Sequence, residues 1–597
     1  MYRLPAGYES ARVHVLVTLH WGASPIRVAT DAVDVTDAVT GEVYAYAPGV
    51  GAVDLEQAAA LAGGGDAQGT SVPLEIVLPV DVPAVMASAT PLAGALCEVA
   101  LWAEGSDYGE RKVVVLGLVA DPEYGEEWEP VRFSVESQAW DDQTLIPGPD
   151  LIVTGTNWVN VATLIPEYLG LPYPIIIGSP GMVSTDTVAP RGWIAAARGV
   201  WAEYDTGSTA GHNTYGVVCL LAGHHVDASR VYITTPETFT QGVRVRVRNS
   251  YDRAGHPIAW LSWYEDWSGT DPGDEFTYNA ATTYSWFTGP ESDGEYTYGL
   301  GSNVINGIYL VDDAQPVLYI AVYDPIDGAT GMQWRGRALR GAGDVIEWAL
   351  SQTTTMVDHA RFASAAERLN QYKIDAFIDA RVNPWEWLNS NVLPLLPVSL
   401  VSGPAGVYPV VWRLDARPDH AEIIIDADAD ASVSRASGVR CDTGGIVNRF
   451  TLRYAYDLMK GKYCATARVS PGPLTSDDLA STVDIVHPLC SRSQATYRTA
   501  VGRPLVAEQE ITSTVIYDNA TALAVLAWMP AAYAMARETV TYSVPATTYG
   551  HRVEVGSVAL LTDSRMSFAG RVALVTAVTD RADGYTDLDL WIRPEVA

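Results

Sequence analysis

The stretch that organises the chain is residues 341–415. It reads GAGDVIEWALSQTTTMVDHARF, then ASAAERLNQYKIDAFIDARVNPWEWLNSNVLPLLPVSLVSGPA, and closes with GVYPVVWRLD. The pattern predicts two or three short helices followed by a returning strand. We expect Asp344 to cap the first helix and Ser364 the second. Asn383 followed by Pro384 predicts the start of the third, because proline in the first helical turn gives up no hydrogen bond.

The composition bounds what the chain can be. Its 597 residues are 48% hydrophobic and 10% aromatic, which suits several domains with large cores. The net charge of −33 argues against sequence-specific nucleic-acid binding, which needs clustered Lys and Arg. No apolar run approaches the ~20 residues of a membrane span, and we expect neither stable membrane insertion nor a signal peptide.

The rest of the chain is rich in short alternating segments, so the predicted fold class is mainly β with α+β parts. We expect several β-barrel or β-sandwich domains with a small helical domain between them. The predicted division is a barrel-like domain at 1–136, a linker at 137–150, a Trp- and Tyr-rich sandwich-like domain at 151–338, the helical domain at 339–415, and an α+β or barrel-like domain at 416–597.

Local patterns mark individual elements. Residues 13–19 alternate Val or Leu with other residues, which predicts a half-buried strand. NSYDRAGHPIAW predicts a hairpin with its turn at 252–255. Asp518 or Asn519 is expected to cap the clearest helix of the chain, in which Pro530 predicts a kink.

Five cysteines, Cys97, Cys219, Cys441, Cys464 and Cys490, are widely spaced and form no CxxC motif. Buried free thiols are therefore expected rather than a disulfide framework or a zinc site. A metal or Fe–S cluster held by Cys441, Cys464 and Cys490 is the alternative, although it is one ligand short of the usual four.

Two polar clusters have the residue types of metal ligands. His224, His225 and Asp227 occur in GHHVD, but adjacent histidines on a strand point to opposite faces, which favours a structural role. Asp426, Asp428 and Asp430 share a face if their segment is extended, and three carboxylates can bind calcium. The glycine of an EF-hand loop is missing there, so a solvated strand edge is favoured.

Two further stretches suggest binding surfaces. Acidic residues lie among tryptophans in the region 255–300, a composition that serves a glycosidase, a sugar-binding loop or a decorated β domain; they are Glu265, Asp266, Asp271, Asp274 and Glu275. Arg244, Arg246 and Arg248 alternate with valines, so one face of the strand carries guanidinium groups that suit an anion or an acidic protein surface. No GxSxG, HExxH, Walker or GxGxxG motif stands in a credible context, and we predict no catalytic, cofactor-binding or metal residues.

Three groups of motifs, in order along residues 160–595, resemble a known family. The first is GLPYPIIIG, LLAGHHVDASRVYITT and NSYDRAGHPIAW. The second is GAGDVIEWAL through GVYPVVWRLD, and the third is IVNRFTLRYAYD, ITSTVIYDNATALAVLAWMPAAYAMARETVTYSV and VEVGSVALLTD. Together they are similar to the tail-tip or baseplate hub proteins of long-tailed bacteriophages and gene-transfer particles. The chain departs from the family at 556–560, where GSVAL lacks the acidic residue.

The resemblance implies a structural virion protein, assembled in the host cytoplasm, with no enzymatic activity and no cofactor. It implies a homotrimer whose two barrel-like domains per subunit form a pseudo-sixfold ring. The implied partners are the distal tail protein ring, the tail tube, the tape measure protein, and tail fibres or receptor-binding proteins. In that setting residues 339–415 would be a joint that lets the ring open for genome delivery.

Two other classes of protein remain open. One is a tail-associated glycan-binding or glycan-degrading protein acting through residues 255–300. The other is a secreted β-rich adhesin, for which no export signal is visible.

Overall fold

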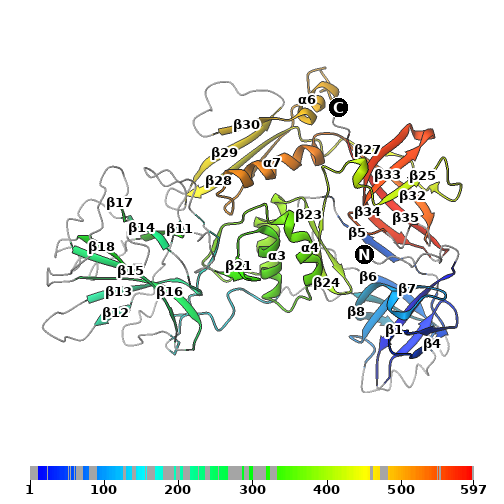
Figure 1. Cartoon of the computed structure of the whole chain (residues 1–597), viewed down its shortest axis with the longest axis horizontal. Coiled ribbons are helices and arrows are strands. Elements are labelled where there is room, and N and C mark those ends of the chain that lie inside the picture. Colours follow the sequence, from blue (N-terminus) through cyan, green and yellow to red (C-terminus); the bar gives the residue numbers. More distant parts are fainter. Residues whose placement is uncertain are drawn as a thin grey trace.

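Figure 1 shows the chain as a computed structural model, with strands gathered into several sheets around a small helical centre. The structure describes residues 11–22, 24–51, 53, 55–59, 61, 71–78, 91–124, 130–136, 143–154, 156–157, 169–178, 180, 194–195, 202–205, 215–225, 228–234, 242–252, 254–265, 285–287, 295–299, 317–322, 332–457, 462–470, 482–546, 549, 553–581 and 583–594. The prediction of a mainly β chain with α+β parts is confirmed. Within the described residues no helix is long and apolar enough to span a membrane.

The N-terminal module is a curled sheet in the order β3-β4-β2-β1-β7-β8-β9-β6. Its strands are β1 (Val13–His20), β2 (Ile26–Ala29), β3 (Val33–Thr36), β4 (Val43–Pro48), β6 (Ser71–Ile76), β7 (Leu96–Ala103), β8 (Lys112–Glu123) and β9 (Val131–Glu136), with a 3-10 turn at Tyr108–Glu110. The strands do not close the sheet on themselves. Residues 49–51 instead bridge its two sides, because Gly49 donates to Ala29 and Gly51 donates to Glu75.

Strand β1 is buried on both faces, so the prediction of a half-buried strand was wrong. One face contributes Val15, Val17 and Leu19 to the interior of the curled sheet. The other face is covered by the hairpin of β3 and β4, against which Leu16 packs and where Thr18 Oγ1 lies 3.0 Å from the hydroxyl of Tyr46. The local alternation could not show this, because the covering hairpin comes later in the sequence.

The second β module holds two sheets, ordered β11-β19-β14-β17 and β12-β13-β16-β15-β18. Its strands are β11 (Ile194–Ala195), β12 (Ala202–Asp205), β13 (Tyr215–Ala222), β14 (Ala228–Thr234), β15 (Gly242–Tyr251), β16 (Pro257–Glu265), β17 (Ser285–Phe287), β18 (Glu295–Gly299) and β19 (Val317–Val322). The hairpin predicted at 252–255 is confirmed, since β15 pairs with β16 and Gly255 N–H donates to the carbonyl of Asp252.

The helical island lies between this module and the rest of the molecule (Figure 1). It contains α3 (Ala342–Ser351), α4 (His359–Leu369), β22 (Ala376–Ile378), α5 (Pro384–Asn391), a 3-10 turn at Leu393–Leu395, and the hairpin of β23 (Val398–Gly403) and β24 (Gly406–Val411). The cap predicted at Asn383 is confirmed, because its side chain accepts from the backbone N–H of Glu386. The returning strand is also confirmed, as β24.

Two predicted caps in the island were wrong. Gly341 occupies the cap position of α3 and makes no side-chain cap, while Asp344 lies in the first turn and binds an arginine instead. Helix α4 begins earlier than predicted because Asp358 caps it, which places Ser364 inside the helix.

Above the island lies a four-stranded sheet, β30-β29-β28-β31, covered by two helices (Figure 1). Its elements are β28 (Arg449–Asp457), β29 (Lys462–Ser470), β30 (Thr482–Val486), α6 (Pro488–Thr496), β31 (Glu508–Thr512) and α7 (Asn519–Tyr533). Asp518 caps α7, as predicted, and Pro530 lies within that helix. The indole N–H of Trp528 donates to the carbonyl of Leu395, so α7 packs directly on the island.

The C-terminal sheet has the order β25-β33-β34-β35-β32-β26, with β27 also paired to β32. Its strands are β25 (Ile423–Asp426), β26 (Ser434–Arg435), β27 (Arg440–Asp442), β32 (Arg537–Pro545), β33 (Val558–Asp563), β34 (Phe568–Asp580) and β35 (Tyr585–Ile592), and 3-10 turns occupy Pro418–His420 and Ser564–Met566. A strand from the start of the chain, β5 (Leu55–Ala58), joins this sheet by pairing antiparallel with β34. The first and last parts of the chain therefore share a sheet.

Candidate functional site

The most heavily connected site is the neck that joins the second β module to the helical island. Two passes of the chain form it. Strand β10 (Ile175–Ile177) pairs with β22 of the island on the way into the module. On the way out, β20 (Gln333–Trp334) and β21 (Arg337–Ala338) form a short hairpin that leads into α3. The two passes meet where Gly178 N–H donates to the carbonyl of Leu339, at 3.1 Å.

The hairpin turn itself is built for a tight reversal. Its two central residues, Arg335 and Gly336, have φ values of 52° and 76°. Two successive left-handed residues give the turn whose twist matches an antiparallel hairpin. The turn therefore directs Arg335 and Arg337 towards α3, and Arg340 follows directly after the hairpin.

Three buried carboxylates of the island receive these three arginines. Arg335 pairs with Glu347, Arg337 Nε lies 2.7 Å from an oxygen of Asp344, and Arg340 Nε lies 2.7 Å from an oxygen of Asp375. The carboxylate side chains are at most 2% exposed, whereas the arginines are 24 to 53% exposed. Buried carboxylates are tolerated when they are paired and hydrogen-bonded. The neck arginines therefore provide the positive charges that compensate the buried carboxylates of the island.

Each carboxylate also has other partners. Glu347 accepts hydrogen bonds from the indole of Trp334 at 3.0 Å and from His359 Nδ1 at 2.7 Å. Asp344 accepts from the side-chain amide of Asn370 at 2.9 Å, and the backbone N–H of Asp344 donates to the same side chain. This network holds the neck hairpin against α3.

Gly178 fits closely against the third pair. Its φ is 62°, and a Cβ at this position would collide with the carboxylate of Asp375 and with the Arg340 side chain. A side chain here would force the two passes of the neck apart.

The neck also explains His224, the most site-like histidine of the sequence. Its Nε2 accepts from the backbone N–H of Ile176 at 2.9 Å, and its Nδ1 lies 2.8 Å from the carbonyl of His225, to which it donates. Burial lowers the pKa of His224 to about 4, so the ring is neutral at pH 7. His225 contacts the ring of Tyr251 edge-on, and Asp227 lies outside the described residues. His224 thus tethers β10 structurally.

A second junction connects the N-terminal module to the C-terminal sheet. Leu55 of β5 is 1% exposed, and β5 pairs with the last four residues of β34. Beside this pairing Lys112 Nζ lies 2.8 Å from a carboxylate oxygen of Asp580, which also accepts from the hydroxyl of Thr586. Strand pairing, an apolar anchor and a largely buried ion pair together attach the two modules.

The three aspartates of DADADA do not share one face of a strand. The prediction of a solvated strand edge holds for Asp426 and was wrong for Asp428 and Asp430. Only Asp426 belongs to a strand, and Asp428 and Asp430 lie in the turn that follows. Asp428 accepts from Ser564 N–H at 2.9 Å, and Asp430 accepts from the hydroxyl of Tyr549 at 3.0 Å. The three carboxylates therefore serve local turns and a contact with the C-terminal sheet.

The cysteines show no shared site among the described residues. Cys441 is exposed on β27, Cys464 is half-buried on β29, and Cys490 is buried in α6, where burial raises its pKa to about 12. Cys97 is buried in the N-terminal module. In the part of the chain that the structure describes, no group of three or more His, Cys, Asp or Glu is placed to hold a metal ion.

Two predicted binding surfaces lie largely outside the described residues. Asp266, Asp271, Asp274 and Glu275 all do, and Glu265 is described only as the end of β16. Arg244, Arg246 and Arg248 fall on β15, but their side chains are outside the described set. A glycan or anion surface at these positions stays a prediction from the sequence.

Sequence reasoning missed the neck arginines. The signal was present, because QWRGRALR at 333–340 places three arginines within six residues in a strongly acidic chain. Their buried partners could not be found in the same way, because Asp344 reads as a helix cap and Glu347 as a surface residue of a helix.

Comparison with known proteins gives no match to a family model and none to a curated protein. Among solved structures the chain is similar to the tail protein from Neisseria meningitidis MC58, at 8% identity over 97% of each chain with a TM-score of 0.31. It is also similar to the 43 kDa tail protein of prophage MuSo2 from Shewanella oneidensis, at 10% identity over 97% of this chain and 98% of that one with a TM-score of 0.30. A third is prophage tail protein gp18 from Listeria monocytogenes EGD-e, at 10% identity over 62% of this chain and 90% of that one with a TM-score of 0.21. TM-scores of this size carry no inference about this chain.

Proposed function

We propose that the chain is a structural protein of a phage tail, the hub at the tail tip or baseplate. In this proposal three copies form a ring that closes the end of the tail tube and carries fibres or receptor-binding proteins. The distal tail protein ring, the tail tube and the tape measure protein are its neighbours in the virion. The colinear motifs across residues 160–595 are the sequence support.

The observation that carries the proposal is the pairing of β5 with β34. A pseudo-sixfold ring from three subunits needs two β modules per subunit, held side by side as one rigid unit. Here the first and last modules share a sheet edge and the Lys112–Asp580 ion pair, and Figure 1 shows them adjacent. The two modules come from opposite ends of the chain, so the ring unit would be formed by the first and last parts of one subunit packed together.

The second β module is set apart from this unit and held by the neck (Figure 1). We place the joint for genome delivery at the neck, because two passes of the chain and their ion pairs join the second β module to the island there. The island itself shares one core with the upper sheet, the C-terminal sheet and the neck strand β10. Ion pairs that join two bodies can be broken and remade without unfolding either body.

Locking the neck tests this part of the proposal. Ile176 lies opposite Phe377 in the β10–β22 pairing, so Ile176→Cys with Phe377→Cys can form a cross-strand disulfide. Particles carrying the oxidised pair should adsorb but not eject their genome, and reductant should restore ejection. Normal ejection from oxidised particles would show that the neck does not need to move.

Immunogold electron microscopy tests the placement. An antibody against this chain should label particles that carry it at the tail tip. Label along the tail shaft, on the head or absent from intact particles would contradict the hub proposal.

A polysaccharide assay tests the glycan alternative. If the region 255–300 acts on glycans, activity on host polysaccharide should disappear in Glu265→Gln or Asp266→Asn particles while their assembly stays normal. The hub proposal expects no such activity.

A further inference from the structure

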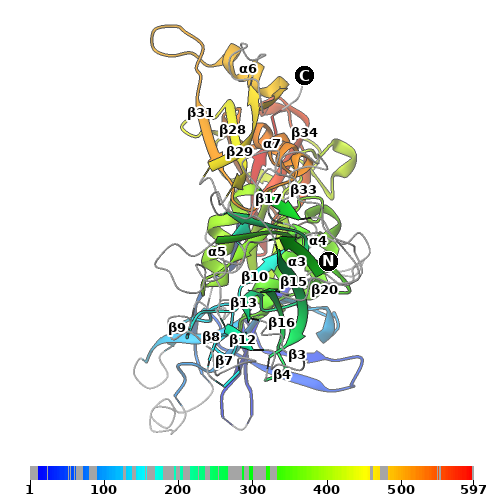
Figure 2. The same ribbon diagram turned by 90° about the vertical axis from the view of Figure 1, so that its left-hand side faces the viewer.

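The upper sheet, which is the four-stranded sheet β30-β29-β28-β31 with its two helices, carries a projecting arm. This arm is basic and has an apolar tip, although the chain as a whole is acidic. Residues 485–507 contain three arginines and no Asp or Glu, although the whole chain has a net charge of −33. Within this stretch residues 497–506, between α6 and β31, form the arm. Figure 2 shows the orange segment between these elements reaching beyond the upper sheet.

The arm is a structured hairpin. Gly502 N–H donates to the carbonyl of Thr499 at 2.8 Å, Thr499 N–H donates to Arg503 at 2.8 Å, and Leu505 N–H donates to Tyr497 at 2.9 Å. Gly502 has a φ of 77°, which suits its turn position. A hairpin whose backbone is already hydrogen-bonded loses less conformational freedom on docking than an unpaired loop does.

The arm exposes to solvent both apolar side chains and arginines that have no ion-pair partner among the described residues. Val501 at its tip is 80% exposed, and Val506 at its base is 49% exposed. Arg498 and Arg503 flank the tip, are exposed, and form no ion pair with any residue that the structure describes. An apolar tip between two guanidinium groups suits a hollow with apolar walls and an acidic rim.

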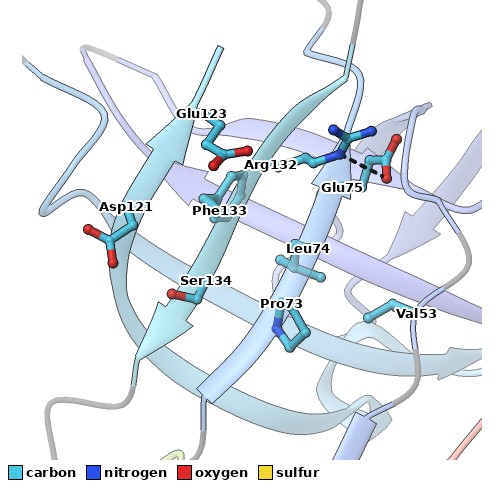
Figure 3. Close-up of a pocket in the computed structure, with 9 residues that line it drawn as sticks. All are labelled: Val53, Pro73, Leu74, Glu75, Asp121, Glu123, Arg132, Phe133 and Ser134. Carbon is cyan, nitrogen blue, oxygen red and sulfur yellow. Dashed lines mark hydrogen bonds and ion pairs between the residues drawn. The ribbon is translucent and has the colours of Figure 1, made fainter. Parts of the chain in front are cut away.

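The N-terminal module has a hollow of that kind, of about 480 Å³. Its apolar wall includes Leu74 and Phe133, and Glu75, Asp121 and Glu123 supply carboxylates around it (Figure 3). All three acidic residues are exposed, and Arg132 also lines the hollow, with its Nε 3.4 Å from Glu75 (Figure 3). The hollow is therefore lined by three carboxylates and one guanidinium group, and it stays net acidic.

The arm and the hollow lie at opposite ends of the subunit. Figure 2 shows the arm at one end of the long vertical dimension and the N-terminal module at the other. An arm therefore cannot reach the hollow of its own chain. Contacts between two different surfaces of identical subunits are head-to-tail, and they close into a ring when the rotation between subunits permits.

We propose that the arm of one copy docks into the acidic hollow of the N-terminal module of a second copy. This rests on the proposed ring of three subunits, and it identifies the surface that joins them. Val501 enters the hollow against its apolar wall, and Arg498 and Arg503 meet the carboxylates of the rim. The same contact, repeated around the ring, brings the upper four-stranded sheet of each subunit beside the N-terminal module of the next.

Charge reversal in the full chain tests the contact, with mass photometry over a dilution series in low salt. Arg498→Glu with Arg503→Glu should raise the concentration at which the trimer dissociates at least tenfold. Glu75→Arg with Glu123→Arg should do the same. All four changes in one chain should restore assembly, because the charges are complementary again. Arg435→Glu with Arg440→Glu, on exposed strands elsewhere, is the matched control and should leave the trimer intact.

The outcomes separate this inference from the hub proposal. A trimeric wild type whose mass is unchanged by both reversals would overturn the arm contact and leave the hub standing. Loss of assembly without rescue in the fourfold variant would also overturn it, since the two surfaces would then not meet. Trimers that persist but no longer bind another tail protein would mean that the arm serves that protein instead. A wild type that is monomeric at every concentration would contradict both proposals.

Discussion

Single residues decide whether the neck holds. Asp375 is fully buried and is paired through both of its oxygens, at 2.7 and 3.1 Å from Arg340. Removing one partner of a buried pair leaves a charge without compensation, which costs about 3 to 5 kcal/mol, whereas an exposed pair contributes about 1 kcal/mol or less. An ion pair of the same geometry therefore contributes much more to the free energy of unfolding at the neck than at the surface.

Arg340→Gln is expected to destabilise the island and the neck by about 3 kcal/mol. Hydrogen exchange of the β22 amides measures this locally. The matched control is Arg453→Gln, whose partner Glu510 is half exposed, and we expect a change below about 1 kcal/mol there. If the two substitutions lowered the free energy of unfolding equally, the larger contribution assigned to the Arg340–Asp375 pair would be contradicted.

His224 should make the neck sensitive to acid. Its folded pKa of about 4 lies below the ordinary value of 6.5, so between these values the unfolded segment binds more protons than the folded one. The stability that its neutral ring gives is complete above pH 6.5 and is lost as the pH falls towards 4. The shift corresponds to about 3 kcal/mol in total.

The measurement is protection of the Ile176 amide from hydrogen exchange at pH 7, 6 and 5, corrected for the intrinsic exchange rate. In the wild type, protection of this amide should decrease as the pH is lowered from 7 to 5. In His224→Gln, protection should depend much less on pH. His20→Gln, at an exposed position, should leave the profile of the wild type. A profile that His224→Gln does not change would exclude this histidine as the cause.

At the scale of elements, β5 joins two modules that lie far apart in the sequence. Leu55, the first residue of β5, is buried in the core of the N-terminal module, so Leu55→Ala should cost about 2 to 5 kcal/mol. We expect the N-terminal module to melt separately and to become a target of limited proteolysis near residue 60. Val39→Ala, at a position 91% exposed, is the control and should behave as the wild type. Retention of a single transition in Leu55→Ala would argue that other contacts hold the modules together.

Elements that depend on neighbouring residues were predictable. The caps at Asn383 and Asp518 and the hairpin at 252–255 follow from residues within a few positions. Elements that depend on distant partners were not. Asp344 is a good cap by type, yet Arg337 and Asn370 bind its carboxylate, and LEQA at 55–58 gives no sign that its partner is β34. The neck needs both kinds of information and was not predicted; the sequence placed the joint in the helical domain at 339–415.

At the scale of the whole molecule, two large cores organise the part of the chain that the structure describes. One fills the N-terminal module, and the other runs through the island, the upper sheet and the C-terminal sheet. The predicted boundaries at 136, 150, 338 and 415 stay a proposal beside this arrangement. The net charge of −33 would oppose association of identical subunits unless basic surfaces such as the arm meet acidic ones.

The mass of the full chain in solution, alone and with tail proteins, tests the central claim most directly. Sedimentation equilibrium should give three times the 64.2 kDa of one chain. The trimer should weaken as salt is added, because charged surfaces join its subunits. A species that remains at 64.2 kDa at all concentrations, even with tail proteins present, would contradict the account.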